Sequence, residues 1–387
     1  MLDWLIIGGG VQGTALSHVL VNRAGVAVAR LRVLDPYDLP LARWHATTHN
    51  TGMTHLRSPE VHHLHDDPWS LRTFAQTQPG RALADFVPIY NRPSLALFNG
   101  HTDWMLERYK LRDMRLQGRA LGLQRQREGW CVETTSGPLM ARRVLLALNT
   151  TEQPHRPAWA QGTTVPHIFD AGFDRETLPP WSHLVIIGGG ISAAQLAMSL
   201  AVRQPATVTL LTRHEIRLSH FDSDPCWVTR LCLETFHQQP DFNQRRAMIQ
   251  QARQPGSMPP DVAAALRHAN QTGALRLQRG EVSALSGDAG AYTLHLAEGD
   301  TLHADSIVLA TGFARVRPGG AWLSAAIANE GLPVADCGYP VIDDSLRWAD
   351  GLYVTGRLAE LEIGPVAANI IGARLAAMRL KHAALQI

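Results

Sequence analysis

Two glycine-rich turns of the same pattern constrain this chain of 387 residues more than any other feature. The segments WLIIGGGVQGTALSHVL at 4–20 and VIIGGGISAAQLAMSL at 185–200 each place glycines between a short apolar run and a helical pattern. In a strand, turn and helix of this kind, the N–H groups at the start of the helix face a pyrophosphate. The repetition predicts two dinucleotide sites, one at each turn.

The first turn has the spacing Gly8, Gly10 and Gly13. The first glycine permits a tight turn, the second lets the backbone approach the phosphates, and the third lets the helix pack close to the strand. The segment ARLRVLD, which we expect to be the next strand, ends at Asp35, where a carboxylate can accept hydrogen bonds from a ribose. These four residues predict a dinucleotide site. The alternative is a glycine turn that only connects two elements.

The second turn differs at two positions. It keeps Gly188 and Gly190, but Ala193 stands in the third place, and the strand that follows ends at Arg213 rather than at an acid. A guanidinium pairs with a 2′-phosphate, which a carboxylate would repel. We therefore expect an unphosphorylated adenosine beside Asp35 and NADPH beside Arg213. The alternative is a solvated arginine at a strand end.

The order of expected elements predicts an α/β fold with two Rossmann-like dinucleotide-binding domains, the second inserted in the first. A hairpin and a buried strand follow each unit, at 121–148 and 275–313, and Pro-rich segments at 154–166 and 179–180 indicate the crossing between domains. A last strand, loop and helix at 351–380 would complete the first domain. The expected limits are residues 1–178 and 316–387 for the first domain and 179–315 for the second.

The composition names no polymer partner. Lysine and arginine total 36 against 34 acidic residues, and a net charge of +2 gives no broad attraction to nucleic acid or anionic lipid. No apolar run reaches the roughly 18 residues of a membrane span. We expect a cytoplasmic protein that acts on a small molecule and can form a homo-oligomer.

The cysteines are sparse and form no CxxC pair, which is typical of a reducing compartment. A gap of six residues would not bring two thiols onto one face of a helix, so dithiol chemistry is not expected for CWVTRLC. We expect all four to be packing residues: Cys131, Cys226, Cys232 and Cys337.

A run of histidines invites a metal hypothesis. No zinc-finger spacing or HExxH pattern is present, so we expect no metal and a polar loop at the mouth of a site instead. The run comprises His45, His49, His55, His62, His63 and His65, followed by Asp66 and Asp67.

Several segments resemble a known family. ARWHATTHNTGMTHLRSPEVHHLHDDPWSLRTFA contains Trp44-His45, Met53-Thr54 and an Asp-Pro-Trp-Ser stretch at 67–70, in an order similar to that of the N-hydroxylating flavoprotein monooxygenases of lysine and ornithine. GGGISAAQ is similar to that family's GGGQSAAE, and SHFDSDPCWVTRLCLETF is similar to its DDSPF segment and following helix. The resemblance implies an FAD- and NADPH-dependent monooxygenase that oxygenates a small amine, or a similar soft nucleophile, with dioxygen through a flavin hydroperoxide.

The resemblance also implies roles for individual residues. Met53 and Thr54 would lie near the isoalloxazine, and His55 or Arg57 near the substrate. Pro365, after Gly364, would precede a helix whose N–H groups stabilise negative charge on the flavin pyrimidine. The remaining residues expected at the cofactors are Trp44, His45, Thr311, Gly312 and Gly356.

The departures from the family keep other functions open. Thr54 replaces a glutamine beside the flavin, the lysine expected to hold a substrate carboxylate is missing with Arg57 the nearest cation, and Gly356-Arg357 replaces a Gly-Asp pair. The alternatives are an FAD-dependent NAD(P)H reductase without productive oxygenation and a non-catalytic FAD-binding redox sensor.

Overall fold

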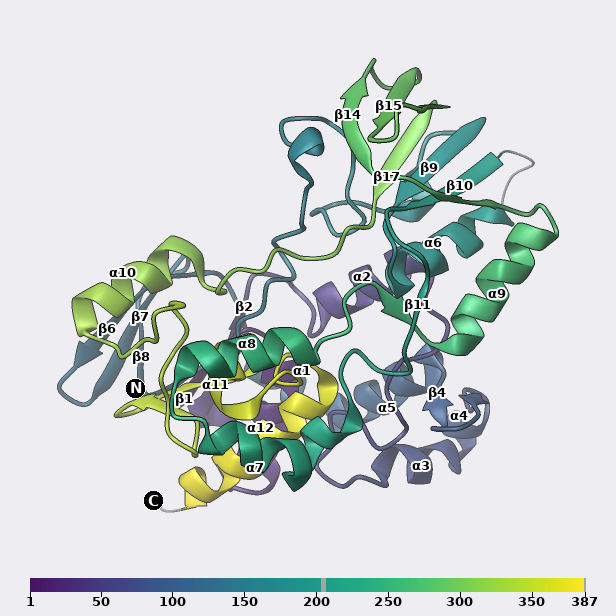
Figure 1. Cartoon of the computed structure of the whole chain (residues 1–387). Helices are drawn as coiled ribbons and strands as arrows, with labels where there is room; N and C mark the ends of the chain where they lie inside the picture. The colour runs from purple at the N-terminus through teal and green to yellow at the C-terminus, as the bar shows by residue number, and fades with distance from the viewer. Residues whose placement is uncertain (203–206, 386–387) are drawn as a thin grey trace.

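The computed structural model describes residues 1–202 and 207–385, which form an α/β fold around a mixed sheet with parallel central strands and a second, parallel sheet (Figure 1). The strand, turn and helix predicted at each glycine motif are present, and the second sheet is inserted in the chain between parts of the first. The fold class predicted from the sequence is therefore confirmed.

The first sheet has the order β18-β19-β8-β1-β2-β5, with β6 and β7 attached through β8. The central strand β1 pairs in parallel with β2 and β8, so that Ile6 lies between Val33 and Leu145. Its last parallel strand, β19, pairs with β8 although some 200 residues separate them. The strands are β1 (Leu2–Ile7), β2 (Leu31–Asp35), β5 (Arg115–Gln117), β6 (Ala120–Gln126), β7 (Gly129–Thr134), β8 (Leu139–Leu146), β18 (Arg347–Ala349) and β19 (Leu352–Val354).

The second sheet has the order β13-β10-β9-β17, and all its pairings are parallel. A separate antiparallel sheet, β14-β15-β16, lies beside it in the upper part of Figure 1. The strands are β9 (His183–Ile187), β10 (Thr207–Thr212), β13 (Arg276–Arg279), β14 (Val282–Ser286), β15 (Tyr292–Leu296), β16 (Thr301–Ala304) and β17 (Ser306–Leu309). Two pairs of two-residue strands remain among the described residues: β3 (Phe86–Val87) with β4 (Arg92–Pro93), and β11 (Arg217–Leu218) with β12 (Ser257–Met258).

Helices cover both sheets. α1 follows the first glycine turn and lies beside α12, and α6 follows the second turn. The helices are α1 (Val11–Asn22), α2 (Ala42–Thr51), α3 (Ser70–Ala75), α4 (Gln78–Arg81), α5 (Leu95–Arg108), α6 (Ile191–Ala201), α7 (Arg230–Gln238), α8 (Phe242–Ala252), α9 (Pro260–Gln271), α10 (Gly320–Glu330), α11 (Glu360–Ile363) and α12 (Ile370–Leu385). Within the described residues, none of these helices has both the length and the apolar character that crossing a bilayer requires.

The division of the buried side chains between the two cores does not follow the order of the strands in the sequence. Trp227, Phe236 and Ile249, from the segment that carries α7 and α8, pack in the core of the first sheet, although they lie between β10 and β13 in the sequence. Figure 1 accordingly shows α7 and α8 beside α11 and α12. The domain limits given above stay a prediction.

Candidate functional site

The first glycine turn is tight on two sides and open on the third. Gly8 has φ +112°, and a Cβ added to it would lie 2.5 Å from the carbonyl oxygen of Ala147 on the neighbouring strand end. A Cβ on Gly13 would lie 1.8 Å from the oxygen of Gly8, so the start of α1 touches the end of β1. No atom lies within 4 Å of a Cβ built on Gly10, which leaves the backbone open to a phosphate. This cradle fits the pyrophosphate of FAD.

Asp35 lies beside this turn. Its carboxylate accepts hydrogen bonds from the N–H groups of Gly9, at 2.5 Å, and Tyr37, at 3.1 Å. Burial raises the pKa of the Asp35 carboxyl, and the two backbone hydrogen bonds oppose that shift. One lone pair on each oxygen remains for a ribose hydroxyl.

Gln12 connects the first turn to residues 355–369. Its side-chain nitrogen donates to the carbonyl oxygens of Ala367 and Asn369, and its oxygen accepts from the hydroxyl of Thr355. Its methylene lies 3.2 Å from the Cβ position of Gly356, which has φ +62°. The turn before α12 is thereby held at the glycine motif. No sequence pattern indicates these contacts, because their partners are more than 340 residues apart.

Arginines surround one buried glutamate at this end of the sheet. Glu360 is fully buried and pairs with Arg246 and Arg253, each at 2.5 Å, while Arg357 lies 3.5 Å away. Arg253 also donates to the carbonyl oxygen of Pro365. Three guanidinium groups against one carboxylate leave this edge of the site positively charged, which suits a bound phosphate. Glu360 has no sequence signal, because Arg246 and Arg253, in and just after α8, lie more than 100 residues before it in the sequence.

The second turn is covered. A Cβ on Gly188 would lie 2.4 Å from the oxygen of Ala310, the counterpart of the contact at Gly8. The imidazole of His214 lies 2.7 Å from the Cβ position of Gly189, and Gly256 Cα lies 3.5 Å from that of Gly190. Residues around Gly256 thus lie over the face that a pyrophosphate would use. Ala193 is fully buried at the third position.

Arg213 directly follows β10, as the sequence predicts. It is exposed, and among the described residues it has no hydrogen-bond or ion-pair partner. The nearby cation Arg279 makes only a 3.7 Å contact with Glu215, which is itself exposed. The guanidinium of Arg213 is therefore accessible to an anionic group such as a 2′-phosphate.

Thr311 and Gly312 lie where the chain returns to the first sheet. The hydroxyl of Thr311 donates to the carbonyl oxygen of His155, and the N–H of His155 donates to the oxygen of Gly312 at 2.8 Å. The two connections between the sheets therefore run side by side. Gly312 has φ +81° and open space around its Cβ position.

Trp44 and His45 begin α2. The indole of Trp44 donates to Asn99 at 3.0 Å and packs against Phe98 on α5. His45 is half-buried, and burial lowers its pKa.

Met53, Thr54 and His55 follow α2 in an extended segment. The N–H of Leu95 donates to the oxygen of Thr54, and the imidazole of His55 lies 3.1 Å from Asp85. Met53 is half-buried, while Thr54 is exposed.

Arg57 contacts a segment from the other part of the chain. Its guanidinium donates to the carbonyl oxygens of Ser219, His220 and Phe221 and to the hydroxyl of Ser257. Burial lowers the pKa of the guanidinium. These contacts make Arg57 a connection between the first sheet and the segments that leave and re-enter the second.

The histidine run is split in the structure. His65 joins His18 of α1 around Asp66: the Asp66 Oδ1 lies 3.0 Å from His18 Nε2 and 3.3 Å from His65 Nδ1. These three could in principle hold a metal ion, since their ligand atoms lie within 4.8 Å of one another. Arg23, however, pairs with the same carboxylate, and the N–H of Asp67 already donates to His65 Nδ1. The contacts are those of an ion-pair network beside a cavity of about 170 Å³.

Burial controls the charge of this network. It lowers the pKa values of His63 and His65 to about 4 and that of His101 to about 2. Although burial also acts to raise the pKa of Asp66, hydrogen bonds from His18 and Arg23 hold it well below its usual range. His63, His65 and His101 are therefore neutral at pH 7, close to the ionised carboxylate of Asp66.

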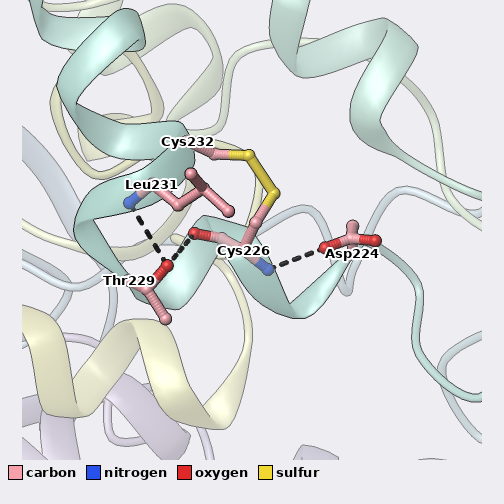
Figure 2. Close-up of a disulfide and its surroundings, with 5 residues drawn as sticks. All are labelled: Asp224, Cys226, Thr229, Leu231 and Cys232. Carbon is pink, nitrogen blue, oxygen red and sulfur yellow. Dashed lines mark hydrogen bonds between the residues drawn. A yellow bond between two sulfur atoms is a disulfide. The ribbon is translucent and has the colours of Figure 1, made fainter.

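The expectation that all four cysteines are packing residues is wrong for two of them. Cys226 and Cys232 form a disulfide, with Cα atoms 5.3 Å apart (Figure 2). Cys226 lies in a 3₁₀ helix, η5 (Pro225–Val228), and Cys232 lies in α7. Thr229 between them is extended, with φ −122° and ψ 170°, so the two cysteines never share one helix and the expected spacing argument fails. Cys131 and Cys337 are free.

The comparisons with known proteins agree with this geometry. A family model described as FAD-NAD(P)-binding matches residues 5–151. No curated protein matches the sequence.

Solved structures match over the whole chain. The cadaverine monooxygenase of desferrioxamine biosynthesis from Erwinia amylovora is 15% identical, with a TM-score of 0.77 over 100% of this chain and 95% of that one. The ornithine N-hydroxylase of Kutzneria sp. 744 is 14% identical, with a TM-score of 0.78 over 100% and 99%. The L-lysine 6-monooxygenase of Pseudomonas syringae is 18% identical, with a TM-score of 0.74 over 100% and 99%.

The chain has the fold of the flavin-dependent N-monooxygenases. In this fold, ten of the predicted residues fall into three groups. Gly8, Gly10, Gly13, Asp35 and Gly356 surround the first turn; Gly188, Gly190, Ala193 and Arg213 surround the second; and Arg57 lies between the two parts.

Proposed function

We propose that this protein is an FAD-dependent, NADPH-using monooxygenase that oxygenates a small amine or a similar soft nucleophile. The observation that carries the proposal is the pairing of unlike glycine turns in one chain: the first has an acid at Asp35, and the second has the unpaired cation Arg213. The solved structures that share the fold are named for lysine, ornithine and cadaverine oxygenation, and one was determined with reduced FAD and NADP⁺.

FAD would bind at the first turn. Gly10 and the start of α1 would face the pyrophosphate, Asp35 the ribose, and Gly356 the chain that links phosphate and flavin. The turn that contains Pro365 and precedes α12 would face the flavin ring, with Trp44 and His45 on α2 as further contacts. When bound, the flavin supplies hydride acceptance and the reaction with dioxygen.

NADPH would bind at the second turn. Gly190 and the start of α6 would face the pyrophosphate, and Arg213 the 2′-phosphate. His214 and Gly256 lie over this turn. The coenzyme must therefore displace them when it binds, or bind after they have moved away. Thr311 and Gly312 lie on the connection that joins the two sites.

The substrate we propose is an amine that does not depend on Arg57 for a carboxylate. The guanidinium already binds three carbonyl oxygens and one hydroxyl, so it is committed to the protein. Met53, Thr54 and His55 are the side chains of this segment that we place near the flavin and the substrate, with the imidazole of His55 held by Asp85. A diamine, like the cadaverine named for one of the similar structures, satisfies this condition.

The test is a balance of NADPH, hydrogen peroxide and product on purified protein reconstituted with FAD. Diamines and basic amino acids are screened, and the yellow chromophore and its bleaching by NADPH in the absence of oxygen are recorded first. Productive oxygenation requires hydroxylated amine equal to the NADPH consumed and little hydrogen peroxide. Stoichiometric peroxide with every substrate would point to a reductase without productive oxygenation. A flavin that NADPH does not bleach would point to a non-catalytic redox sensor. A protein that binds no FAD would end the proposal.

The remaining features of the proposal follow from the same chemistry. We propose a cytoplasmic protein, where NADPH is available, that works on small molecules and can form a homo-oligomer. The two-domain limits at 178/179 and 315/316 belong to the proposal as well, and limited proteolysis with mass spectrometry would test them.

A further inference from the structure

The disulfide between Cys226 and Cys232 lies at the surface. Both cysteines are half-buried, and the residues between them at 229–231 are exposed, with Leu231 77% exposed. A small thiol can therefore reach the sulfur atoms without unfolding the protein.

The inward side of the same segment contacts the turn before α12. Trp227 and Leu233 each lie 3.5 Å from the Cβ position of Gly364. Asp222, just before the disulfide, accepts hydrogen bonds at 3.0 and 3.1 Å from the amide of Asn369. Residues 222–238 thus cover the turn at 364–369.

Each half of the segment is capped without the disulfide. The carboxylate of Asp224 accepts from the N–H of Cys226 at 2.8 Å (Figure 2). The hydroxyl of Thr229 accepts from the N–H of Leu231 and donates to the oxygen of Cys226. Breaking the sulfur bond therefore leaves η5 and α7 capped as helices, but it removes the covalent link that holds η5, which carries Trp227, against α7, which carries Leu233.

We propose that Cys226–Cys232 is a thiol–disulfide exchange site, whose opening loosens the turn at 364–369. An external thiolate attacks one sulfur, which forms a mixed disulfide and releases the other cysteine as a thiolate that takes a proton. A second external thiol then attacks the mixed disulfide. Two small thiols are oxidised to one disulfide, and the protein gains two electrons and two protons. A small disulfide reverses the reaction.

The exchange itself depends only on the cysteines, whereas its effect on the flavin rests on the proposed function. If the turn at 364–369 faces FAD, the closed disulfide holds it against the cofactor through Trp227, Leu233 and Asp222. The dithiol form then binds FAD more weakly.

Thiol counting in the native protein tests the exchange. The air-oxidised chain should offer two thiols, those of Cys131 and Cys337, to a denaturing thiol assay. After incubation with reduced glutathione without denaturant and rapid alkylation, four should be alkylated, and oxidised glutathione should restore two. The matched controls are a Cys131→Ser/Cys337→Ser variant, which keeps the exchange, and a Cys226→Ser/Cys232→Ser variant, which abolishes it. A bond that opens only in denaturant, or four thiols that oxidised glutathione cannot pair, overturns the site.

FAD titration of both redox forms tests the coupling. Reduction should weaken FAD binding by about fivefold or more, the lower end of typical coupling between two sites. The Cys226→Ser/Cys232→Ser variant should match the reduced wild type and ignore glutathione, while the Cys131→Ser/Cys337→Ser variant should respond like the wild type. Equal FAD affinity in both forms overturns the coupling.

A protein that binds no FAD in either form would refute the proposed function but not the exchange. The loosening is then followed by tryptophan fluorescence in the wild type and in Trp227→Phe. A redox-dependent change that Trp227→Phe removes supports the proposal. Fluorescence that does not change between the two forms overturns the loosening.

Discussion

The two glycine turns share a plan but differ in how closely they pack and in what lies over them. At the first, a Cβ on Gly13 would collide with the oxygen of Gly8, and the face at Gly10 is open. At the second, Ala193 stands in the third position and is accommodated, while His214 and Gly256 lie over the turn. We propose that the first turn is an open cradle for a resident cofactor, and that the second is a covered site for a coenzyme that comes and goes.

The largest effect should follow from giving the first turn the alanine of the second. Gly13→Ala places a methyl group 1.8 Å from a backbone oxygen, so α1 must move away from β1. We expect a loss of stability on the order of 5 kcal/mol, at the severe end for a point mutation. The reverse change in the second turn, Ala193→Gly, should cost only about 1 kcal/mol through helix propensity and lost burial. Urea denaturation measures both, and comparable losses would contradict the difference in packing.

The next largest effect should be a loss of stability in acid, to which the first part contributes more buried histidines than the second. Burial lowers the pKa values of three histidines in the first part, His63, His65 and His101, and it lowers the pKa of His167, beside β17 of the second sheet, to about 4. Below about pH 6.5 the unfolded chain takes up protons that the folded chain refuses, so the stability is fully present above that pH and falls as the pH drops toward 4. Each histidine contributes about 1.4 kcal/mol per pH unit in this interval.

Calorimetry from pH 7.5 to 5 measures this loss, and His101→Gln should flatten the slope. His268→Gln, at an exposed histidine of α9, is the matched control and should leave the slope unchanged. A melting temperature independent of pH would contradict the neutral histidine network.

Arg57→Ala should loosen the connection between the two parts. It removes the guanidinium donor from the carbonyl oxygens of Ser219 and His220, while that of Phe221 keeps the hydroxyl of Ser219, and the loss costs about 3 kcal/mol. Arg57→Lys keeps the charge but not the fork of donors, so we expect an intermediate loss. Thermal unfolding measures both variants. If Arg57→Ala instead leaves stability unchanged and raises only the KM for the amine, Arg57 is a substrate anchor after all.

Gly10→Ala should separate binding from folding at the first turn. Gly10 has φ −78° and ψ −163°, which alanine adopts freely, and its Cβ position is empty. We expect unchanged stability in the FAD-free protein but FAD binding weaker by roughly tenfold to a hundredfold, because the methyl group takes the place of the pyrophosphate. Unchanged FAD affinity in a fluorescence titration would place the cofactor elsewhere.

The smallest effect should be a change in coenzyme preference that follows from a substitution at the second turn. Arg213→Ala removes the partner of the 2′-phosphate, so the preference for NADPH over NADH should fall about tenfold while FAD binding stays the same. The ratio of kcat/KM for the two coenzymes measures this. Arg279→Ala, at the end of the neighbouring strand, is the matched control and should leave the ratio nearly unchanged.

The sequence predicts the parts of this molecule that local patterns determine. Both strand, turn and helix units, the end of β2 at Asp35 and the late strand β19 follow from hydrophobic runs and glycines. The contacts of Arg57 could not be predicted, because backbone carbonyl oxygens 160 residues away carry no side-chain signature. The disulfide could not be predicted from the spacing of Cys226 and Cys232 on a continuous helix, because the extended Thr229 interrupts the helix between them. The packing of Trp227 and Phe236 in the first core likewise depends on a long-range path that no local periodicity reveals.

The link from Gln12 to Thr355, Ala367 and Asn369 has a consequence for how the protein is made. The first turn is synthesised more than 340 residues before the partners of its amide, which it can contact only when residues 355–369 have emerged. β19, which belongs to the same sheet, is equally late. A nascent chain therefore holds an unfinished cradle until these residues appear, and FAD can act as a ligand that draws the two distant segments together.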